Sequence, residues 1–120
     1  MKLVYIAGPY GAKTAEAEDP DAAIAKSGLQ IELNIRHARR EAIRLWEAGY
    51  AVICPHLNTA RMELDCKLDH AGYLAGDFEI IRRCDALVML RGWETSKGSA
   101  MEKAHAESLA IPVFYEGDLP

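Results

Sequence analysis

Four short apolar runs recur along the chain, each bounded by turn-forming or polar residues. The first stops at Gly8 and Pro9, and the second stops at Pro55, where a strand could not continue its ladder of hydrogen bonds. Short apolar runs with such boundaries are typical of strands that are buried on both faces of a sheet. We therefore predict strands at residues 3–7, 50–54, 86–90 and 111–115.

Helical periodicity separates these strands. Apolar residues recur every three or four positions from Asn34, a fair N-cap residue, to Gly49, where the run ends. Similar segments extend from about His70 to Arg83 and from about Ala100 to Leu109. We predict a helix over each segment. The first apolar stripe comprises Ile35, Ala38, Ala42, Leu45 and Trp46, and the second comprises Leu74, Phe78 and Ile81.

Residues 12–30 show no sustained apolar period. The segment is rich in Ala, Glu, Asp, Lys and Gly, and Pro20 and Gly28 interrupt it. We predict a mobile loop with at most one helical turn over these residues.

The alternation of strands and helices predicts the fold class. It is typical of an α/β fold with a parallel sheet covered by helices on both faces. We expect residues 1–120 to form a single doubly wound, Rossmann-like domain, with about four strands in the order 2-1-3-4. Ligands bind such sheets beyond the carboxyl ends of the strands, where the strand order reverses. This rule brings together residues 8–11, 55–58 and 92–99 as the candidate site.

Composition and charge narrow the expected partners. The 120-residue chain carries a net charge of -4, which favours neither duplex DNA nor duplex RNA as a partner. No apolar run approaches the roughly 18 residues of a membrane span, so we expect a soluble protein with no membrane partner.

The cysteines predict the compartment. Cys54, Cys66 and Cys84 are odd in number and lack C-x-x-C spacing, which argues against a disulfide framework or a zinc site. We therefore expect free thiols and a cytoplasmic protein.

The segment Ser96–Glu102 combines small residues with the predicted start of a helix. Free backbone N–H groups at such a position can bind an anion, for example a phosphate. A structural interpretation competes, because Ser99 and Glu102 also have the spacing of a capping box that satisfies a helix terminus. The local pattern leaves both interpretations open.

A second carboxylate, Asp77, falls beside the apolar stripe of its predicted helix. It follows Leu74 by three positions and precedes Ile81 by four, whereas Glu79 and Arg83 lie on the solvated face. Asp77 could be a helix-edge carboxylate satisfied by a nearby N–H group. Alternatively, it could share a pocket with Glu102, and unequal burial would then raise one pKa and leave the other group ionised. Such a pair is the general solution for cleaving glycosidic bonds.

The order and spacing of several short motifs resemble the nucleoside 2-deoxyribosyltransferase family and its relatives, the 2'-deoxynucleoside 5'-phosphate N-hydrolases. The resemblance spans nearly the whole chain. The motifs are Ile6-Ala7-Gly8-Pro9-Tyr10, Asn34-Ile35, Gly76-Asp77-Phe78, Cys84-Asp85-Ala86 and Ser96-x-Gly98-x-x-x-Glu102-x-x-x-Ala106.

The resemblance implies specific roles for the two carboxylates. Glu102 would attack the anomeric carbon of a deoxyribose, and Asp77 would orient Glu102 and exchange protons with the base. The covalent glycosyl-enzyme would then pass its sugar to another base, as in a transferase, or to water, as in a hydrolase. In the hydrolase branch, a loop after the first strand and a serine near the nucleophile hold the 5'-phosphate. The matching candidates here are Gly8, Pro9, Tyr10, Gly11, Ser96 and Ser99, and Gly98 is a further candidate for substrate binding.

Four further residues are candidates for the substrate pocket, each with a structural alternative. Tyr10 could line the sugar pocket or cover the core, and His56 could contact the base or phosphate or make a structural hydrogen bond. Trp93 could stack on a base or close the sheet edge. Asp85 matches a family motif, but a residue directly before a strand can simply turn the chain.

The sequence departs from the family at two places. Lys103 and Ala104 follow the candidate nucleophile instead of the common Leu-Gly. The chain also stops soon after the last predicted strand, whereas the transferases have a longer C-terminal portion, which favours the hydrolase-like branch.

We therefore expect an N-glycosidase or deoxyribosyltransferase acting on a small deoxynucleoside or deoxynucleotide. It would need no cofactor or metal, and it would be a homo-oligomer because family pockets are completed across subunits. Two alternatives remain on the same fold: a non-catalytic nucleotide-binding module, and a hydrolase of another N-riboside such as a nicotinamide nucleotide.

Overall fold

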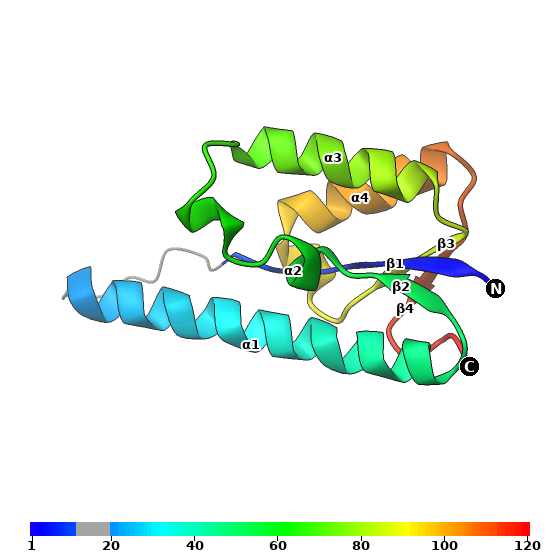
Figure 1. The fold of residues 1–120 in the computed structure, drawn as a ribbon, viewed down its shortest axis with the longest axis horizontal. Helices are drawn as coiled ribbons and strands as arrows, with labels where there is room; N and C mark the ends of the chain where they lie inside the picture. The colour runs from blue at the N-terminus through cyan, green and yellow to red at the C-terminus, as the bar shows by residue number, and fades with distance from the viewer. Residues whose placement is uncertain (12–19) are drawn as a thin grey trace.

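The protein folds around a four-stranded parallel sheet in the order β2-β1-β3-β4, as the sequence predicts (Figure 1). The computed structural model describes residues 1–11 and 20–120. The strands are β1 (Leu3–Ala7), β2 (Ala51–Ile53), β3 (Ala86–Met89) and β4 (Val113–Tyr115). The helices are α1 (Pro20–Glu47), α2 (Pro55–Asn58), α3 (His70–Arg82) and α4 (Lys97–Ser108), with short 3-10 turns η1 (Met62–Leu64) and η2 (Trp93–Thr95).

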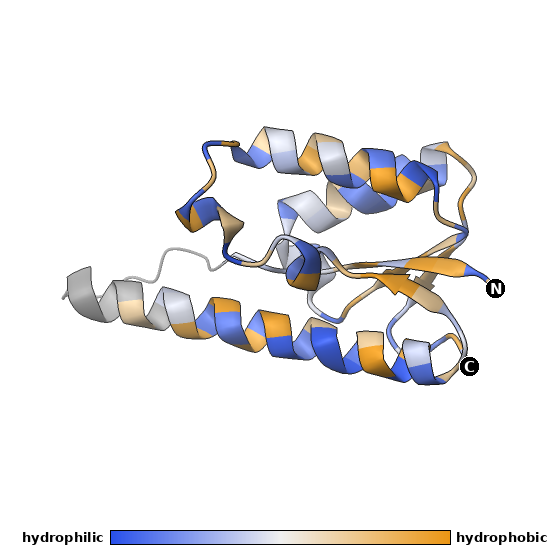
Figure 2. Cartoon of the chain, viewed as in Figure 1, coloured by the Kyte–Doolittle hydropathy of each residue, from blue (hydrophilic) through white to orange (hydrophobic). Residues whose placement is uncertain are grey.

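Helices cover both faces of the sheet, with α1 on one face and α3 and α4 on the other (Figure 1). Successive side chains of a strand point to opposite faces, so β1 contributes to two cores. Val4 and Ile6 pack with α1, whereas Tyr5 and Ala7 pack with α3 and α4. Each of these four side chains is at most 1% exposed, and β1 and β2 are predominantly hydrophobic in Figure 2. Burial on both faces accounts for the continuous apolar run of β1.

The helix α1 corrects the prediction of a loop over residues 12–30. Residues 12–19 lie outside the described part of the chain, and residues 20–47 form one helix. Pro20 is the first helical residue, a position where its missing N–H costs no hydrogen bond. The first half of α1 extends beyond the sheet in Figure 1, and Leu29 and Leu33 are 60% and 47% exposed. A helix that buries so little there needs no apolar period, which is why the pattern predicted a loop.

Asn34 is not the N-cap of this helix, contrary to the prediction. It lies within α1, and its side-chain amide donates to the carbonyl oxygen of Tyr10 at 3.0 Å. The predicted end of the helix is confirmed, because α1 stops at Glu47 and Gly49 takes the positive φ of 99° that favours glycine.

The remaining elements follow the predictions with small shifts. The predicted connection at residues 55–58 forms the single helical turn α2, which starts with proline. The helix α4 begins at Lys97, three residues before the predicted start at Ala100, because Ser96 provides the N-cap.

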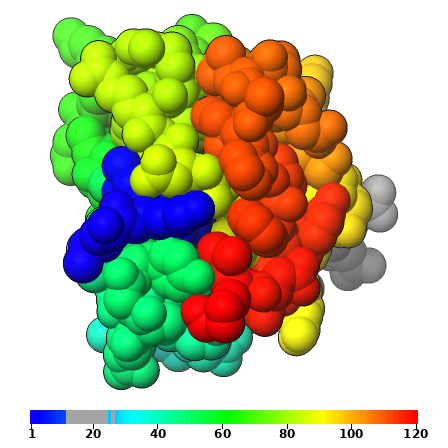
Figure 3. Space-filling view, turned by 90° about the vertical axis from the view of Figure 1, so that its right-hand side faces the viewer, coloured from blue at the N-terminus to red at the C-terminus, as the bar shows by residue number. Residues whose placement is uncertain are grey.

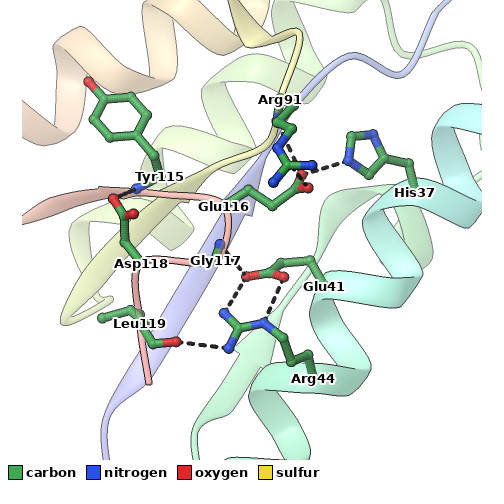
Figure 4. Close-up of polar contacts among 9 residues, drawn as sticks. All are labelled: His37, Glu41, Arg44, Arg91, Tyr115, Glu116, Gly117, Asp118 and Leu119. Carbon is green, nitrogen blue, oxygen red and sulfur yellow. Dashed lines mark hydrogen bonds and ion pairs between the residues drawn. The ribbon is translucent and has the colours of Figure 1, made fainter.

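The C-terminal residues are fastened to α1 by a buried carboxylate (Figure 4). Glu41 is 6% exposed and receives two hydrogen bonds from the guanidinium of Arg44. Arg44 also donates to the carbonyl oxygen of Leu119 at 2.8 Å, and the Leu119 side chain joins the core on the α1 face. These contacts hold the segment after β4 against α1.

Gly8 allows the ends of β1 and β3 to approach closely. A Cβ atom at Gly8 would lie 2.6 Å from Cδ1 and 2.8 Å from Cβ of Leu90, which is 1% exposed. At Gly11, a Cβ atom would meet no atom within 4 Å. The strand end therefore needs glycine at position 8 for packing.

We predict that Gly8→Ala lowers the free energy of unfolding by about 1–3 kcal/mol, because the buried Leu90 side chain cannot yield without disturbing its neighbours. The matched Gly11→Ala should change it by less than about 0.5 kcal/mol. Urea denaturation followed by circular dichroism measures both. Equal stability of the two variants would contradict the packing explanation.

Candidate functional site

A pocket of about 480 Å³ opens beyond the carboxyl ends of the central strands, where the strand order predicts a site. The end of β1, the loop after β2, and the N-terminal halves of α3 and α4 contribute to its wall. Most of the predicted site residues line it: Gly8, Tyr10, Gly11, His56, Asp77, Ser96, Gly98, Ser99 and Glu102.

Glu102 lies at the base of this pocket and does not cap a helix. The N-cap of α4 is Ser96, whose hydroxyl accepts the N–H of Ser99 at 3.2 Å. Glu102 follows one turn later, is 7% exposed, and accepts a hydrogen bond from the hydroxyl of Tyr5. The capping-box interpretation of Ser99 and Glu102 is therefore wrong, because the box would have to start at Ser96.

Asp77 reaches the same tyrosine from α3. The side chain of Asp77 is partly buried and lines the pocket, and its proximity to the Tyr5 hydroxyl lowers the pKa of its carboxyl group. Tyr5 itself is fully buried on β1. Three elements far apart in sequence therefore converge on one phenolic oxygen and place two carboxyl groups beside it.

Burial and mutual repulsion keep the two carboxyl groups from ionising together at neutral pH. Burial raises the pKa of Glu102 to about 8, the charge of Asp77 raises it too, and the Tyr5 hydrogen bond opposes both effects. Burial raises the pKa of Asp77 to about 6, against the Tyr5 hydrogen bond and the charge of His70. Between these values the pair holds one proton, and it titrates as a unit.

Tyr5 remains a hydrogen-bond donor throughout this range. Burial, together with the charges of Glu102 and Asp77, raises the pKa of its hydroxyl well above the ordinary value. A neutral phenol between two carboxyl groups stabilises whichever of them is ionised.

Small hydroxyl groups flank the start of α4 at the pocket wall. The hydroxyl of Ser99 donates to that of Ser96 at 3.0 Å, and Ser99 is 1% exposed. Gly98 lies between them and leaves the backbone accessible beside the ring of His70. Backbone N–H groups and hydroxyls at a helix N-terminus suit a phosphate or another small anion.

Tyr10 and His56 line the pocket and also support the loop after β1. The hydroxyl of Tyr10 donates to Glu63 at 2.8 Å and accepts the backbone N–H of Arg61 at 2.7 Å. Nε2 of His56 lies 2.7 Å from the carbonyl oxygen of Pro9, so it carries the hydrogen and donates. Burial lowers the pKa of His56, which keeps the ring neutral. The structural hydrogen bond considered for His56 is present, and Pro9 itself lines an adjacent hollow.

The structure does not place Asp85 or Trp93 in the pocket, and these two assignments are corrected. Asp85 accepts the backbone N–H of Leu3 at 2.8 Å, at the amino ends of β1 and β3. This end of the sheet faces the viewer in Figure 3, where the N-terminal residues lie against neighbouring segments. Trp93 packs against the core beside α4, with Nζ of Lys103 5.4 Å from its ring centroid. Asp85 thus ties two strand starts together, and Trp93 covers a sheet edge.

Several pocket residues escaped the sequence reasoning. Tyr5 was assigned to the core with the rest of its strand, although a tyrosine in an aliphatic run is a signal, because its hydroxyl needs a partner when buried. Glu63 lies in a polar connection without apolar periodicity, and His70 and Tyr73 lie on the predicted helix, where the pattern did not distinguish them as site residues. Further lining comes from Ile31, Thr59, Leu68 and Leu74.

Neither a metal centre nor a membrane span is found in the part of the chain that the structure describes. No group of three or more His, Cys, Asp or Glu side chains there could hold a metal ion. Among the described helices, none is both long enough and apolar enough to cross a bilayer.

Comparison with solved structures defines the fold. A 2-deoxyribosyltransferase from the psychrotolerant bacterium Bacillus psychrosaccharolyticus superimposes with a TM-score of 0.63 and 17% sequence identity, over 98% of this chain and 76% of the other. The protein therefore has the nucleoside 2-deoxyribosyltransferase fold. Residues 27–115 match the family described as "Domain of unknown function (DUF4406)", and the chain belongs to that family. No curated protein matches the chain in sequence.

We predict that Glu102→Gln stabilises the protein at neutral and alkaline pH. The folded chain holds the Glu102 proton up to a pKa of about 8, against an ordinary value of 4.5. The stability from this proton is complete below pH 4.5 and is lost as the pH rises towards and through 8. Glutamine does not ionise, so the variant should gain about 1–3 kcal/mol at pH 8 and little at pH 4.

Thermal unfolding of both proteins between pH 4 and pH 9 measures this effect. Glu107→Gln, at a largely exposed position later in α4, is the matched control and should show no such pH-dependent gain. A gain for Glu102→Gln that is the same at pH 4 and pH 8 would contradict the raised pKa.

Proposed function

We propose that the protein cleaves the N-glycosidic bond of a 2'-deoxynucleoside or its 5'-monophosphate through a covalent glycosyl-enzyme on Glu102. The observation that carries the proposal is the convergence of Glu102 and Asp77 on the hydroxyl of Tyr5 in one pocket. A pair of carboxyl groups of unequal pKa is the arrangement that glycosidic bond cleavage requires.

The single proton of the carboxyl pair has a role in the first step. Attack needs Glu102 ionised and the departing base needs a proton, so the reactive form has the proton on Asp77. Glu102 forms a bond to C1' as the bond from C1' to the base nitrogen breaks. Asp77 supplies the proton to the base, and the Tyr5 hydroxyl steadies the Glu102 carboxylate until the ester forms.

In the second step the ester is broken by water or by an acceptor base. Asp77, ionised after the first step, accepts the proton of the incoming group, and Glu102 leaves as a carboxylate. The similarity to the Bacillus 2-deoxyribosyltransferase supports deoxyribosyl chemistry. The hydroxyls of Ser96 and Ser99 at the start of α4 support a substrate that carries a 5'-phosphate.

A second copy of the chain is part of this proposal. The outward side of α1 carries several large apolar side chains at the surface, and a homo-oligomer would cover them. They are Leu29, Leu33, Ile43 and Trp46, which are between 39% and 60% exposed.

We predict that the wild-type protein releases free base from a deoxynucleoside or its 5'-monophosphate, alone or with an acceptor base. Glu102→Gln should lower kcat by at least about 10³-fold while the substrate still binds, because the nucleophile is missing and the shape is kept. Chromatography of reactions with a panel of deoxynucleosides, ribonucleosides and their monophosphates measures this. Ligand binding without base release from any of them would instead indicate a nucleotide-binding module.

We predict that Tyr5→Phe shifts the pH dependence of catalysis upwards. The Tyr5 hydrogen bond lowers the pKa of both Glu102 and Asp77, so its removal makes Glu102 harder to ionise. The kcat/KM of the wild type should depend on pH as a bell with limbs near pH 6 and pH 8, and in the variant both limbs should move to higher pH, with about a tenfold loss at pH 6. Tyr50→Phe is the control, because Tyr50 lies outside the pocket and should leave the profile unchanged. An unshifted profile for Tyr5→Phe would contradict this role for Tyr5.

A further inference from the structure

A second hollow of about 750 Å³ opens directly beside the candidate pocket. Five residues belong to the walls of both spaces: Tyr10, Gly11, His70, Ser96 and Gly98. The hollow continues from these shared residues between α1, which contributes Gln30 and Asn34, and the segment between β3 and α4. A ligand that lies over Glu102 and passes Ser96 can therefore extend into this hollow without leaving the protein.

The charged side chains around the hollow are basic. Arg91 and Lys97 line it, together with His37 and His70, and no carboxylate is found among the described residues of its wall. This is unusual for a chain with a net charge of -4, in which acidic residues outnumber basic ones. The side chains that line the hollow therefore favour an anion.

Glu116 holds two residues of this wall, His37 and Arg91, in place (Figure 4). Its carboxylate lies 2.6 Å from Nε2 of His37 and accepts the backbone N–H of Arg91 at 3.2 Å. Nε of Arg91 lies 3.7 Å from the same carboxylate, and the Arg91 side chain is 83% exposed. The contact fixes the backbone of Arg91, and its guanidinium pairs with no second carboxylate among the described residues.

The two cations flank the residues that the proposed function assigns to the 5'-phosphate. Lys97 directly follows Ser96 at the start of α4, and it makes no ion pair in the described part of the chain. Arg91 lies at the end of β3, on the side towards α1. Negative charge that continues beyond the first phosphate would thus meet Lys97 and Arg91 in the hollow.

We propose that this hollow holds the outer phosphates of a deoxynucleoside 5'-diphosphate or triphosphate whose sugar lies over Glu102. The inference rests on the proposed function and names its substrate class. The reaction is unchanged: the bond from C1' to the base nitrogen breaks, the base gains a proton, and water or an acceptor base supplies the new bond to C1'. The phosphate bonds stay intact, so with water the products are the free base and a deoxyribose 5-diphosphate or 5-triphosphate.

Binding to the Glu102→Gln variant tests the inference without turnover. Calorimetry in EDTA would compare the mono-, di- and triphosphate of one deoxynucleoside, chosen from the panel above. We expect the triphosphate to bind at least about tenfold more tightly than the monophosphate, because each outer phosphate adds charge-assisted contacts. Inorganic tripolyphosphate alone should bind more weakly than the nucleoside triphosphate, since it lacks the sugar and base.

A second experiment removes the positive charges that line the hollow. Adding Arg91→Ala and Lys97→Ala to Glu102→Gln should remove most of the preference for the triphosphate. Arg82→Ala is the matched control, because it removes an exposed cation at the other end of α3 and should keep the full preference. Equal affinity for all three nucleotides, or a preference that survives loss of both cations, would overturn the inference.

Turnover by the wild-type protein separates this inference from the proposed function. Base release from the monophosphate, without the expected affinity order, would uphold the glycosidase and overturn the polyphosphate site. Tighter, cation-dependent binding of the triphosphate with no base released from any nucleotide would uphold the binding site and overturn the glycosidase.

Discussion

The hydrogen bond that the Tyr5 hydroxyl donates to Glu102, with Asp77 nearby, is the interaction on which the site depends. A phenol at the middle of a buried strand must find a partner, because an unpaired hydroxyl there would be costly. Glu102 and Asp77 meet that need, and in return the hydroxyl offsets part of the cost of burying two acids. The same burial makes the pair retain one proton near neutral pH. Core packing and acid-base chemistry are therefore set by the same three side chains.

The layout of the sheet could be predicted from the sequence because strands that are buried on both faces are continuously apolar. The continuous apolar runs mark the central strands, and helical segments between them require parallel strands with helices on both faces. The start of α1 has no such apolar pattern. Its first turns extend past the sheet and expose Leu29 and Leu33, so the apolar period that marks a packed helix is missing there. Helix propensity, without packing, supplies a weaker signal than periodicity.

The candidate site could be predicted in part, for reasons that differ from residue to residue. Strand order placed residues 8–11, 55–58 and 92–99 at one edge of the sheet. Helix position and the family resemblance then added Asp77 and Glu102, and both line the pocket. Asp85 was misplaced because the family motif was given more weight than its position directly before β3, at the amino ends of the strands. Trp93 was misplaced because an aromatic ring suits a core as well as a base. Glu63 approaches the pocket from a segment whose path no local pattern specifies, whereas His70 lies at the start of a predicted helix and was not recognised as a site residue.

The site can form only when β1 pairs with its neighbours in the native register. Alternate residues of β1 face opposite sides, so Val4 and Ile6 meet α1 while Tyr5 faces α3 and α4. A slip of one residue in the pairing of β1 with β3 would exchange these sides. An aliphatic side chain would then face Glu102 and Asp77, and the phenol would enter the core beside α1. A misregistered chain could keep its helices and its overall shape while losing the hydroxyl that joins its two acids. Only the native register places the Tyr5 hydroxyl beside Glu102 and Asp77.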